Sequence, residues 1–341
     1  MTGENKLKEA AYYEKLKDKA VVCNLCPNYC RLAEGKTGIC RARKNVGGKL
    51  YSLVYGKIAS RHIDPVEKKP LYHFLPGTEI YSIATTGCNL RCKFCQNWQI
   101  SQAEDGEAET EFFTPEEVVG DALKNKVKAI AFTYNEPTIY YEYMLEIAKL
   151  ARKKGLKTAV ISAGYINQEP LKKLLPYIDA YKIDFKGFSE DFYKNLTGGK
   201  LEPVLETMKT IKKSGTWLEI VNLVVTGHND SDGHLKGLAL WVKDNLGEDT
   251  PLHFTRFHPD YKLTNVPPTP VITLKKAREM AMKAGLRYVY AGNISDPASN
   301  TTFCPKSGEP AIIRNGFFVM KNSLDKNGKC PDGSKVPGVW K

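Results

Sequence analysis

Arginine is scarce in this sequence, and long apolar runs are missing from it. Only ten of the 50 basic residues are arginines, so lysines supply most of the excess over the 38 acidic residues and hence the net charge of +12. Lysine is usually a solvated surface residue, whereas recognition of nucleic acids relies on the planar arginine fork. The charge therefore permits an acidic partner or RNA without indicating either.

No segment approaches the roughly 20 apolar residues of a membrane span. Residues 1–19 are charged and helical in pattern, and no apolar region of the kind found in signal peptides follows them. Internal repeats and low-complexity tracts are also missing, and the hydrophobic fraction of 42% is ordinary for a globular protein. We therefore expect a soluble, cytoplasmic protein with a large core and no membrane partner.

Nine cysteines are many for a cytosolic protein, and their number is odd. In a reducing compartment, clustered thiols hold metal more often than they form disulfides. The cysteines fall into three groups along the chain: Cys23, Cys26, Cys30 and Cys40; then Cys88, Cys92 and Cys95; then Cys304 and Cys330.

From about residue 80, short β-branched or aromatic runs alternate with longer segments of helical period, which is typical of βα units on a parallel sheet. The helices have clear boundaries. Thr114 and Glu117 form a capping box with Pro115 at the first helical position, and Gly215 ends a later helix. The predicted strands are Ile80–Thr85, Lys128–Thr133, Lys157–Ile161, Ala180–Phe185, Trp217–Val225, Leu252–Arg256 and Arg287–Tyr290.

Six βα units and a seventh strand are fewer than the eight units of a closed TIM barrel. The sequence therefore predicts an α/β fold with an open, partial (β/α)6 barrel over residues 80–297. Residues 1–79 before it predict a small cysteine-rich module with short strands. Residues 298–341 are turn-rich and too few to form a core of their own, so we expect a short, ribbon-like tail.

The strongest motif is the loop directly after the first barrel strand, where Cys88, Cys92 and Cys95 follow the spacing C-x3-C-x2-C. A structural zinc ion normally takes four ligands, and no fourth cysteine is nearby. Three thiolates on a cubane [4Fe–4S] cluster leave one iron open to a small ligand. Barrel enzymes place their active sites in such loops. The alternatives are a zinc knuckle that borrows a distant thiol, or a chance spacing.

With Phe94 before its last cysteine, the loop resembles the C-x3-C-x-aromatic-C motif of the radical S-adenosylmethionine (SAM) superfamily. The resemblance implies a radical SAM barrel in which Cys88, Cys92 and Cys95 bind a [4Fe–4S] cluster, and SAM binds its open iron. The reduced cluster then splits SAM into methionine and a 5′-deoxyadenosyl radical, which abstracts hydrogen. An electron donor such as flavodoxin or ferredoxin is implied as well.

Further SAM contacts are expected after the second and third strands. Glu136 matches the last residue of the family's Gly-Gly-Glu motif, which orients the amino group of SAM, although Tyr134 and Asn135 replace the glycines. A simple helix cap is the structural alternative for this carboxylate. Ser162 is a candidate polar contact in a segment that an ordinary strand-to-helix turn explains equally well.

Charged and apolar residues alternate along the fourth predicted strand, so Lys182, Asp184 and Lys186 share one face. Helices cover the outer face of a parallel barrel, so these charges should point into the lumen, where a charged ligand would pair with them. A solvated antiparallel strand is the alternative. The Asp-x-Lys pair resembles the SAM-binding motif of glycyl-radical activating enzymes. The same resemblance implies a SAM contact for His258, and Asn293 could reach the adenine side.

The N-terminal cysteines Cys23, Cys26, Cys30 and Cys40 lie within eighteen residues. Four thiols are enough for a closed zinc site or for a second iron–sulfur cluster, and a disulfide does not suit the cytosol. We expect a structural metal here that replaces the core this segment lacks, with zinc and iron–sulfur both open.

The C-terminal cysteines, Cys304 and Cys330, each begin one half of what looks like a zinc ribbon. Each half lacks its second cysteine, with Ser307 and Gly333 in those places. Two thiolates make a poor zinc site, so we expect this tail to be metal-free or to bind metal weakly.

Nearly the whole chain resembles the AmmeMemoRadiSam-system radical SAM enzymes, which are relatives of pyruvate formate-lyase activating enzyme. The resemblance implies Memo-like and AMMECR-like partners and leaves the substrate open between a protein glycine, another protein and a small molecule. Two alternatives remain: radical modification of RNA, and a zinc-dependent binding module built on the N-terminal cysteines. The supporting segments are 23–27, 64–73, 96–98, 256–259 and 337–340.

Overall fold

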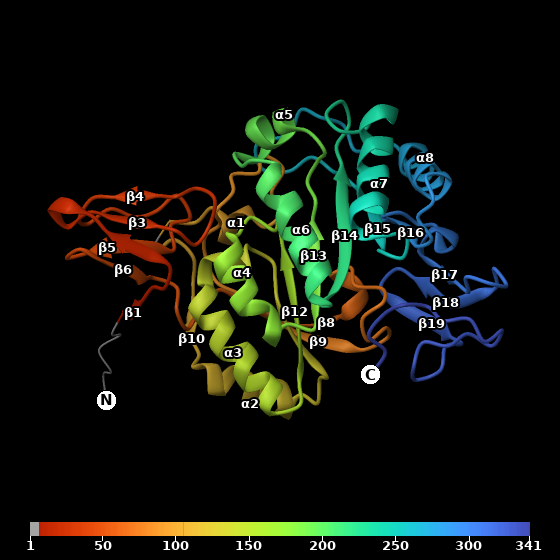
Figure 1. The fold of residues 1–341 in the computed structure, drawn as a ribbon, viewed down its shortest axis with the longest axis horizontal. Helices are drawn as coiled ribbons and strands as arrows, with labels where there is room; N and C mark the ends of the chain where they lie inside the picture. The colour runs from red at the N-terminus through yellow and green to blue at the C-terminus, as the bar shows by residue number, and fades with distance from the viewer. Residues whose placement is uncertain (1–6, 105) are drawn as a thin grey trace.

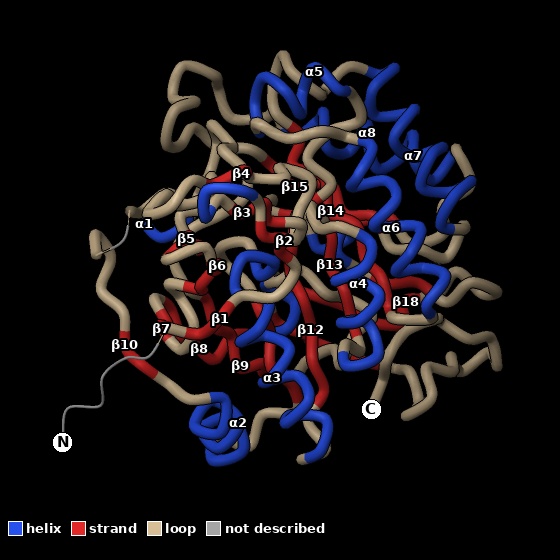
Figure 2. Tube along the Cα trace, turned by 60° about the vertical axis from the view of Figure 1, so that its left-hand side comes forward, coloured by secondary structure: helices blue, strands red, loops and turns tan. Residues whose placement is uncertain are grey.

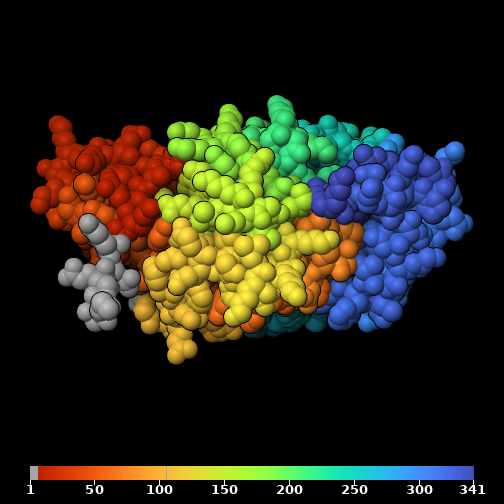
Figure 3. All heavy atoms as spheres, turned by 90° about the horizontal axis from the view of Figure 1, so that it is seen from below, coloured from red at the N-terminus to blue at the C-terminus, as the bar shows by residue number. Residues whose placement is uncertain are grey.

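The computed structural model describes residues 7–104 and 106–341. An N-terminal module, a central α/β unit and a C-terminal tail follow one another along the longest axis (Figure 1). Figure 3 shows the same succession on the surface, from red at the N-terminal end to blue at the C-terminal end. Within the described residues, no helix is both long enough and apolar enough to span a membrane.

The central unit is built on one eight-stranded sheet with the order β16-β15-β14-β13-β12-β11-β9-β8. Its seven parallel strands confirm the seven that the sequence predicts, with no end more than two residues from its predicted place. No described residues of β16 pair with β8, so the sheet is an open, partial barrel. The parallel strands are β9 (Glu79–Ala84), β11 (Ala129–Phe132), β12 (Lys157–Ser162), β13 (Ala180–Asp184), β14 (Trp217–Val224), β15 (Leu252–Arg256) and β16 (Val289–Gly292).

The eighth strand, β8 (Ser60–Pro65), pairs antiparallel with β9 and was not predicted. Its sequence has no apolar alternation, and five of its six residues are at least partly exposed, with only Asp64 buried. An edge strand of this kind is held by backbone hydrogen bonds to one neighbour. The domain boundary after residue 79 stays a prediction, and the sheet includes β8 on its N-terminal side.

The helices lie outside the strands (Figure 2). The predicted capping box is present, because Thr114 Oγ1 accepts from the N–H of Glu117 and Glu117 accepts from the N–H of Thr114. Gly215 ends α6 with φ +81°, a conformation that favours glycine. The helices are α1 (Trp98–Ser101), α2 (Pro115–Lys124), α3 (Tyr141–Lys153), α4 (Gln168–Leu174), α5 (Glu190–Phe192), α6 (Glu202–Ser214), α7 (Asp232–Leu246) and α8 (Val271–Lys283).

The N-terminal module consists of short antiparallel strands. The helical pattern predicted for residues 1–19 is wrong where the chain is described, because Lys8–Glu9 pairs with β6 and Tyr13–Lys15 pairs with β3; residues 1–6 lie outside the described part. Two- and three-residue strands depend on distant partners that a local pattern does not reveal. The strands are β1 (Lys8–Glu9), β2 (Tyr13–Lys15), β3 (Val21–Cys23), β4 (Arg31–Leu32), β5 (Arg43–Val46), β6 (Lys49–Ser52), β7 (Lys57–Ile58) and, pairing with β7, β10 (Glu111–Phe112).

The C-terminal tail forms a three-stranded sheet of β17 (Thr302–Phe303), β18 (Pro310–Asn315) and β19 (Phe318–Asn322). The tail shares a buried apolar cluster with the barrel, in which Ile312 packs among Tyr72 and Tyr290. It therefore gains its core from the barrel, as its short length requires.

Candidate active site

A cavity of about 960 Å³ lies where the parallel strands end. The loops after β9 and β11 contribute Cys88 and Glu136 to its wall, and β13 and β15 contribute Asp184 and Arg256. The turn between β18 and β19 adds Phe317 from the C-terminal tail. The cavity therefore gathers side chains from the strand ends and from the tail in one space, at the face where barrel enzymes carry their active sites.

Three free cysteines of the loop after β9 lie on this wall: Cys88, Cys92 and Cys95. Burial raises the pKa of all three thiols, and it raises that of Cys92 to about 12 although the charge of Lys186 opposes the shift. A metal takes cysteine as thiolate, so metal binding here releases protons. Three thiols that border one large cavity, with only Cys92 fully buried, suit a metal centre better than they suit a packed core.

The spacing of these thiols distinguishes between kinds of metal centre. No three sulfurs of this loop come within 4.8 Å of one another. Two sulfurs on a single zinc ion lie at most about 4.6 Å apart, which is twice the Zn–S bond length. The loop is therefore too open for one zinc ion and suits a centre with several metal atoms.

Neighbouring segments fix the loop at its start and in its middle. The N–H of Arg91 donates to the carbonyl of Thr197 at 2.7 Å. Gly87 has φ +92°, and a Cβ on it would overlap the backbone carbonyl of Cys40. Glycine is thus required before Cys88 for its conformation and for the close approach of the N-terminal module.

Glu136 is buried at the end of β11, and both of its carboxylate oxygens are occupied. Oε1 accepts from the N–H and the hydroxyl of Thr138 and from Ser162 Oγ, and Oε2 accepts from the N–H of Ala163. Three donors thus share Oε1 and one donor uses Oε2, so Oε2 keeps one lone pair for a further donor. Glu136 therefore caps the following 3-10 turn and joins β11 to β12, and Ser162 serves this carboxylate; direct SAM contacts for the two remain predictions.

The charged residues of β13 face the cavity as expected. Asp184 bridges Lys182 and Lys186, with 3.3 Å between its Oδ2 and Lys186 Nζ. Burial raises the pKa of Asp184, but the two lysines outweigh burial and hold it below its ordinary value. Burial lowers the pKa of Lys186, and Asp184 together with Cys92 and Cys95 outweighs burial and raises it. Lys186 therefore stays protonated beside two of the loop thiols.

The two remaining candidates for SAM contacts, Asn293 and His258, differ in their position relative to the cavity. Asn293 lies on the cavity wall. His258 is 56% exposed and outside the wall, with its Nδ1 3.4 Å from Nε2 of the wall residue Gln96. His258 therefore lies next to the site, and a SAM contact for it stays a prediction.

The N-terminal cysteines Cys23, Cys26, Cys30 and Cys40 line one enclosed pocket of about 20 Å³. This pocket is separate from the large cavity and has no cysteine in common with it. The four residues that the sequence grouped by spacing are therefore brought together in space.

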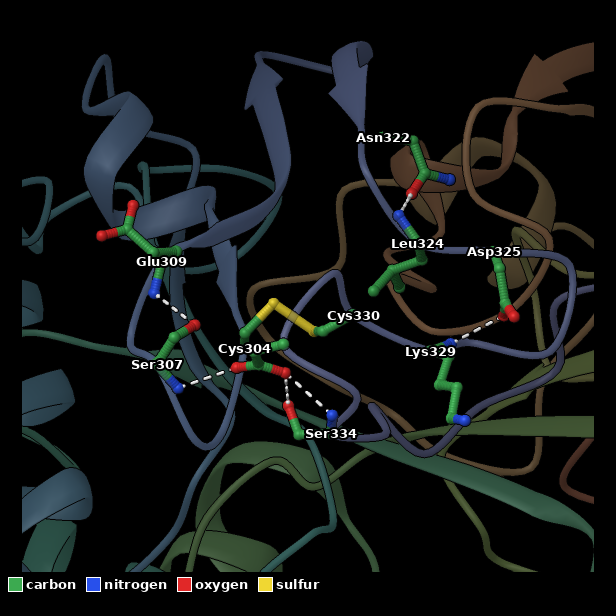
Figure 4. Close-up of a disulfide and its surroundings, with 10 residues drawn as sticks. Cys304, Ser307, Glu309, Asn322, Leu324, Asp325, Lys329, Cys330 and Ser334 are labelled. Carbon is green, nitrogen blue, oxygen red and sulfur yellow. Dashed lines mark hydrogen bonds between the residues drawn. A yellow bond between two sulfur atoms is a disulfide. The ribbon is translucent and has the colours of Figure 1, made fainter.

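The C-terminal cysteines form a disulfide between Cys304 and Cys330 (Figure 4). The Asp332 carboxylate lies beside them and accepts from the N–H groups of Ser307 and Ser334 at 2.9 and 2.8 Å. Ser307 thus supports the turn in the place where a zinc ribbon would have a cysteine.

Comparison with known proteins identifies the family. Residues 82–242 match the family model of the radical SAM superfamily. An uncharacterized protein of Methanocaldococcus jannaschii is 48% identical over 319 residues, which cover 94% of this chain and 95% of that protein. The pyruvate formate-lyase-activating enzyme of Clostridium pasteurianum is 25% identical over 199 residues, which cover 53% of this chain and 80% of the enzyme. This chain belongs to the radical SAM superfamily.

The fold of this radical SAM protein is also found among solved structures. A radical SAM methyltransferase from Sphaerobacter thermophilus superimposes with a TM-score of 0.51 at 14% identity, over 65% of this chain and 68% of the methyltransferase. The likeness confirms the partial barrel predicted from the sequence.

The superfamily implies a [4Fe–4S] cluster and SAM, and the residues of the cavity fit both. Three widely spaced thiols suit the cluster, and about 960 Å³ is ample for a ligand the size of SAM. Asn135 lines this wall, and its Nδ2 donates to the carbonyl of Gly87 at 3.0 Å, so it supports the segment that leads into the cysteine loop. Its Oδ1 is shielded from the cavity and has no hydrogen-bond partner.

Sequence reasoning missed several cavity residues of this radical SAM protein. Asn135 was noted only as a departure from a glycine motif. His253 lines the cavity, and its Nε2 lies 2.8 Å from the buried carboxylate of Glu219. Glu67 enters from the turn after β8. The sequence did contain a clue to Glu67, because this residue lies in segment 64–73, which resembles the family. It also contained a clue to His253, because His253 and Thr255 alternate along β15 and so share a face.

Proposed function

We propose that this radical SAM protein cleaves SAM reductively and abstracts a hydrogen atom from a protein substrate, as glycyl-radical activating enzymes do. The observation that carries the proposal is the convergence of Cys88, Cys92 and Cys95 with the charged face of β13 on one large cavity. A [4Fe–4S] cluster bound there supplies the electron that splits SAM into methionine and a 5′-deoxyadenosyl radical.

The residues of the chain have distinct tasks in this proposal. Cys88, Cys92 and Cys95 are the cluster ligands. Asp184 and Lys186 offer opposite charges to a zwitterionic ligand, and Lys186 also balances the negative charge of the thiolates. Asn135 supports the start of the cysteine loop through the carbonyl of Gly87, and Glu136 and Ser162 keep the loop after β11 in place.

The choice of a protein substrate is supported by relatives whose names describe activating enzymes. Besides the enzyme of Clostridium pasteurianum, the 4-hydroxyphenylacetate decarboxylase activating enzyme of Clostridium scatologenes is 30% identical over 131 residues, which cover 37% of this chain and 42% of that enzyme. A flavodoxin or ferredoxin would supply the electron. Memo-like and AMMECR-like partners, and a small-molecule substrate, remain predictions from the sequence.

Two alternatives from the sequence give different results in simple measurements. Modification of RNA would appear as substrate binding that weakens steeply with salt, because lysines would displace counterions from phosphates. A zinc-dependent binding module would contain zinc without iron. Membership of the radical SAM superfamily favours the enzyme over the binding module.

The test is production of 5′-deoxyadenosine by the full chain. The protein is reconstituted anaerobically with iron and sulfide, reduced with dithionite and supplied with SAM, and the nucleoside is measured by mass spectrometry. We expect the wild-type protein to form 5′-deoxyadenosine and the Cys92→Ser variant to lose at least 100-fold in rate, because one cluster ligand is missing.

The control is the double variant C304S/C330S, which removes two sulfurs from the tail and none from the cysteine loop, and we expect it to keep the reaction. Product formation that persists in Cys92→Ser, or a wild-type protein with full iron content that makes none, would contradict the proposal. Screening candidate glycyl-radical proteins in the same assay identifies the substrate by its loss of hydrogen.

A further inference from the structure

The N-terminal module contains a second group of thiols that the proposed function does not use. Cys23 ends β3, and its N–H donates to the carbonyl of Cys30 at 3.0 Å, while the N–H of Tyr29 donates to the carbonyl of Cys26 at 3.2 Å. These hydrogen bonds fold residues 23–30 back on themselves. Cys23, Cys26, Cys30 and Cys40 all line the same pocket.

The thiols of this pocket are also too far apart for one zinc ion. No three of Cys23, Cys26, Cys30 and Cys40 have sulfurs within 4.8 Å of one another, although a tetrahedral zinc site needs every pair within about 4.6 Å. Among the described residues, the only group that meets this distance contains the disulfide-bonded Cys304 and Cys330 with Asp332. The N-terminal thiols thus share the wide spacing of the Cys88 loop.

The space between these thiols leads to the same conclusion. The pocket holds about 20 Å³, more than the roughly 10–15 Å³ that one buried water needs. The sulfurs of Cys30 and Cys40 each lie 3.7 Å from the place where a Cβ on Gly38 would be, so both thiols border the same side of the pocket. Four sulfurs at about 2.3 Å from a single zinc ion would leave no room for a water between them.

The surroundings suit a buried anionic centre. Leu25, Leu32 and Ile139 form apolar parts of the wall. The guanidinium of Arg43 is 1% exposed, and its Nη1 lies 3.9 Å from Cys23 Sγ. The same guanidinium also pairs with the buried carboxylate of Glu142 through Nη2, so it donates toward one thiolate while its charge is shared with Glu142.

From this geometry we propose that Cys23, Cys26, Cys30 and Cys40 bind a second [4Fe–4S] cluster, and not a zinc ion. All four iron atoms of this cluster would have a cysteine ligand, so it has no open position for SAM. The inference concerns the N-terminal module alone and does not depend on the proposed function.

The second site lies next to the loop that carries Cys88. Asn28 Nδ2 donates to the carbonyl of Asn89 at 2.8 Å, and Asn89 also forms part of the N-terminal pocket wall. The two sites nevertheless share no cysteine. Substitution of one set of ligands therefore leaves the other set intact, which allows each metal to be counted separately.

The experiment uses the full-length triple variant C88S/C92S/C95S, which removes the first site. It is reconstituted anaerobically with iron, sulfide and an equal amount of zinc, and metals and sulfide are counted per chain. We expect the variant to retain the iron and sulfide of one [4Fe–4S] cluster, half of the wild-type content, with the electron paramagnetic resonance signal of a reduced cubane. Zinc without iron in this variant would overturn the proposal.

A second variant excludes misfolding as an explanation. Cys30→Ser in the triple background removes one ligand from a partly exposed position, and we expect it to lose the remaining cubane signal. Circular dichroism shows whether each variant keeps its helices. A folded triple variant that binds neither iron nor sulfide also contradicts the proposal, as does a cluster that is unaffected by Cys30→Ser.

Discussion

Ser162 Oγ donates a 2.7 Å hydrogen bond to Oε1 of Glu136, and this bond connects the carboxyl ends of two neighbouring barrel strands. Both residues are 2% exposed. A buried carboxylate needs full hydrogen bonding, and here the donors all come from the chain itself. Glu136, which the sequence motif indicates as a ligand-binding residue, thus has a structural role that the motif does not indicate.

Glu136→Gln should destabilise the protein by about 3 kcal/mol, because an amide group would replace one oxygen that now accepts hydrogen bonds and would face a donor. Chemical unfolding followed by circular dichroism measures this loss. The matched control is Glu116→Gln on the exposed surface of α2, for which we expect a change below about 0.5 kcal/mol. Equal effects of the two substitutions would contradict the structural role.

Gly87→Ala should prevent the cysteine loop from reaching its position. The new Cβ would overlap the carbonyl of Cys40, and φ of +92° is unfavourable for alanine. Gly155→Ala is the matched control, because Gly155 also has a positive φ of +76° but has open space around it. We expect about 1 kcal/mol of destabilisation for Gly155→Ala, and for Gly87→Ala a larger loss together with a fall in bound iron after reconstitution. Full iron content in Gly87→Ala would refute the overlap.

Asp184→Asn should leave Lys182 as a buried charge without its carboxylate partner. Removal of one member of a buried ion pair costs about 3 kcal/mol, whereas an exposed pair contributes little. Asp244→Asn on the exposed face of α7 serves as the control, since its partner Lys243 is in solvent. Unfolding free energies of the two variants at pH 7 test the difference, and a smaller loss for Asp184→Asn than for Asp244→Asn would count against it.

Stability should fall with acid because of His73. Its ring is fully buried between the carbonyl of Pro337 and the hydroxyl of Tyr290, and burial lowers its pKa to about 4. Unfolded histidine has a pKa of about 6.5, so the unfolded chain takes up a proton first as the pH falls. The contribution of neutral His73 is complete above about pH 6.5 and declines toward pH 4, by about 2 kcal/mol between pH 7 and pH 5.

The measurement for His73 compares the pH dependence of unfolding in the wild type and in His73→Phe. The variant is less stable at pH 7, because it leaves Pro337 and Tyr290 without their partner. Its stability should nevertheless change less between pH 7 and pH 5 than that of the wild type. A slope as steep as that of the wild type would show that another group titrates in this range.

The sequence predicts those parts of the fold that depend on the local residue type or on a periodic pattern of residues. The parallel strands and the capping box at Thr114 follow from alternation and from residue type, and the wall position of Asp184 follows from side-chain alternation along β13. The sequence does not predict β8, because an exposed edge strand requires only backbone pairing. It also does not predict that Asn135 has a free acceptor, since that depends on where Gly87 lies.

The contacts of His73 and its neighbour Tyr72 also determine when the molecule can be completed during synthesis. His73 meets Pro337 across 264 residues, and the carbonyl of Tyr72 receives Arg314 at 2.7 Å across 242 residues. A ribosome extends the chain from its N-terminus, so residues 74–336 are made before His73 can reach Pro337. His73 and the carbonyl of Tyr72 therefore lack these partners until the tail that carries Arg314 and Pro337 has been synthesised.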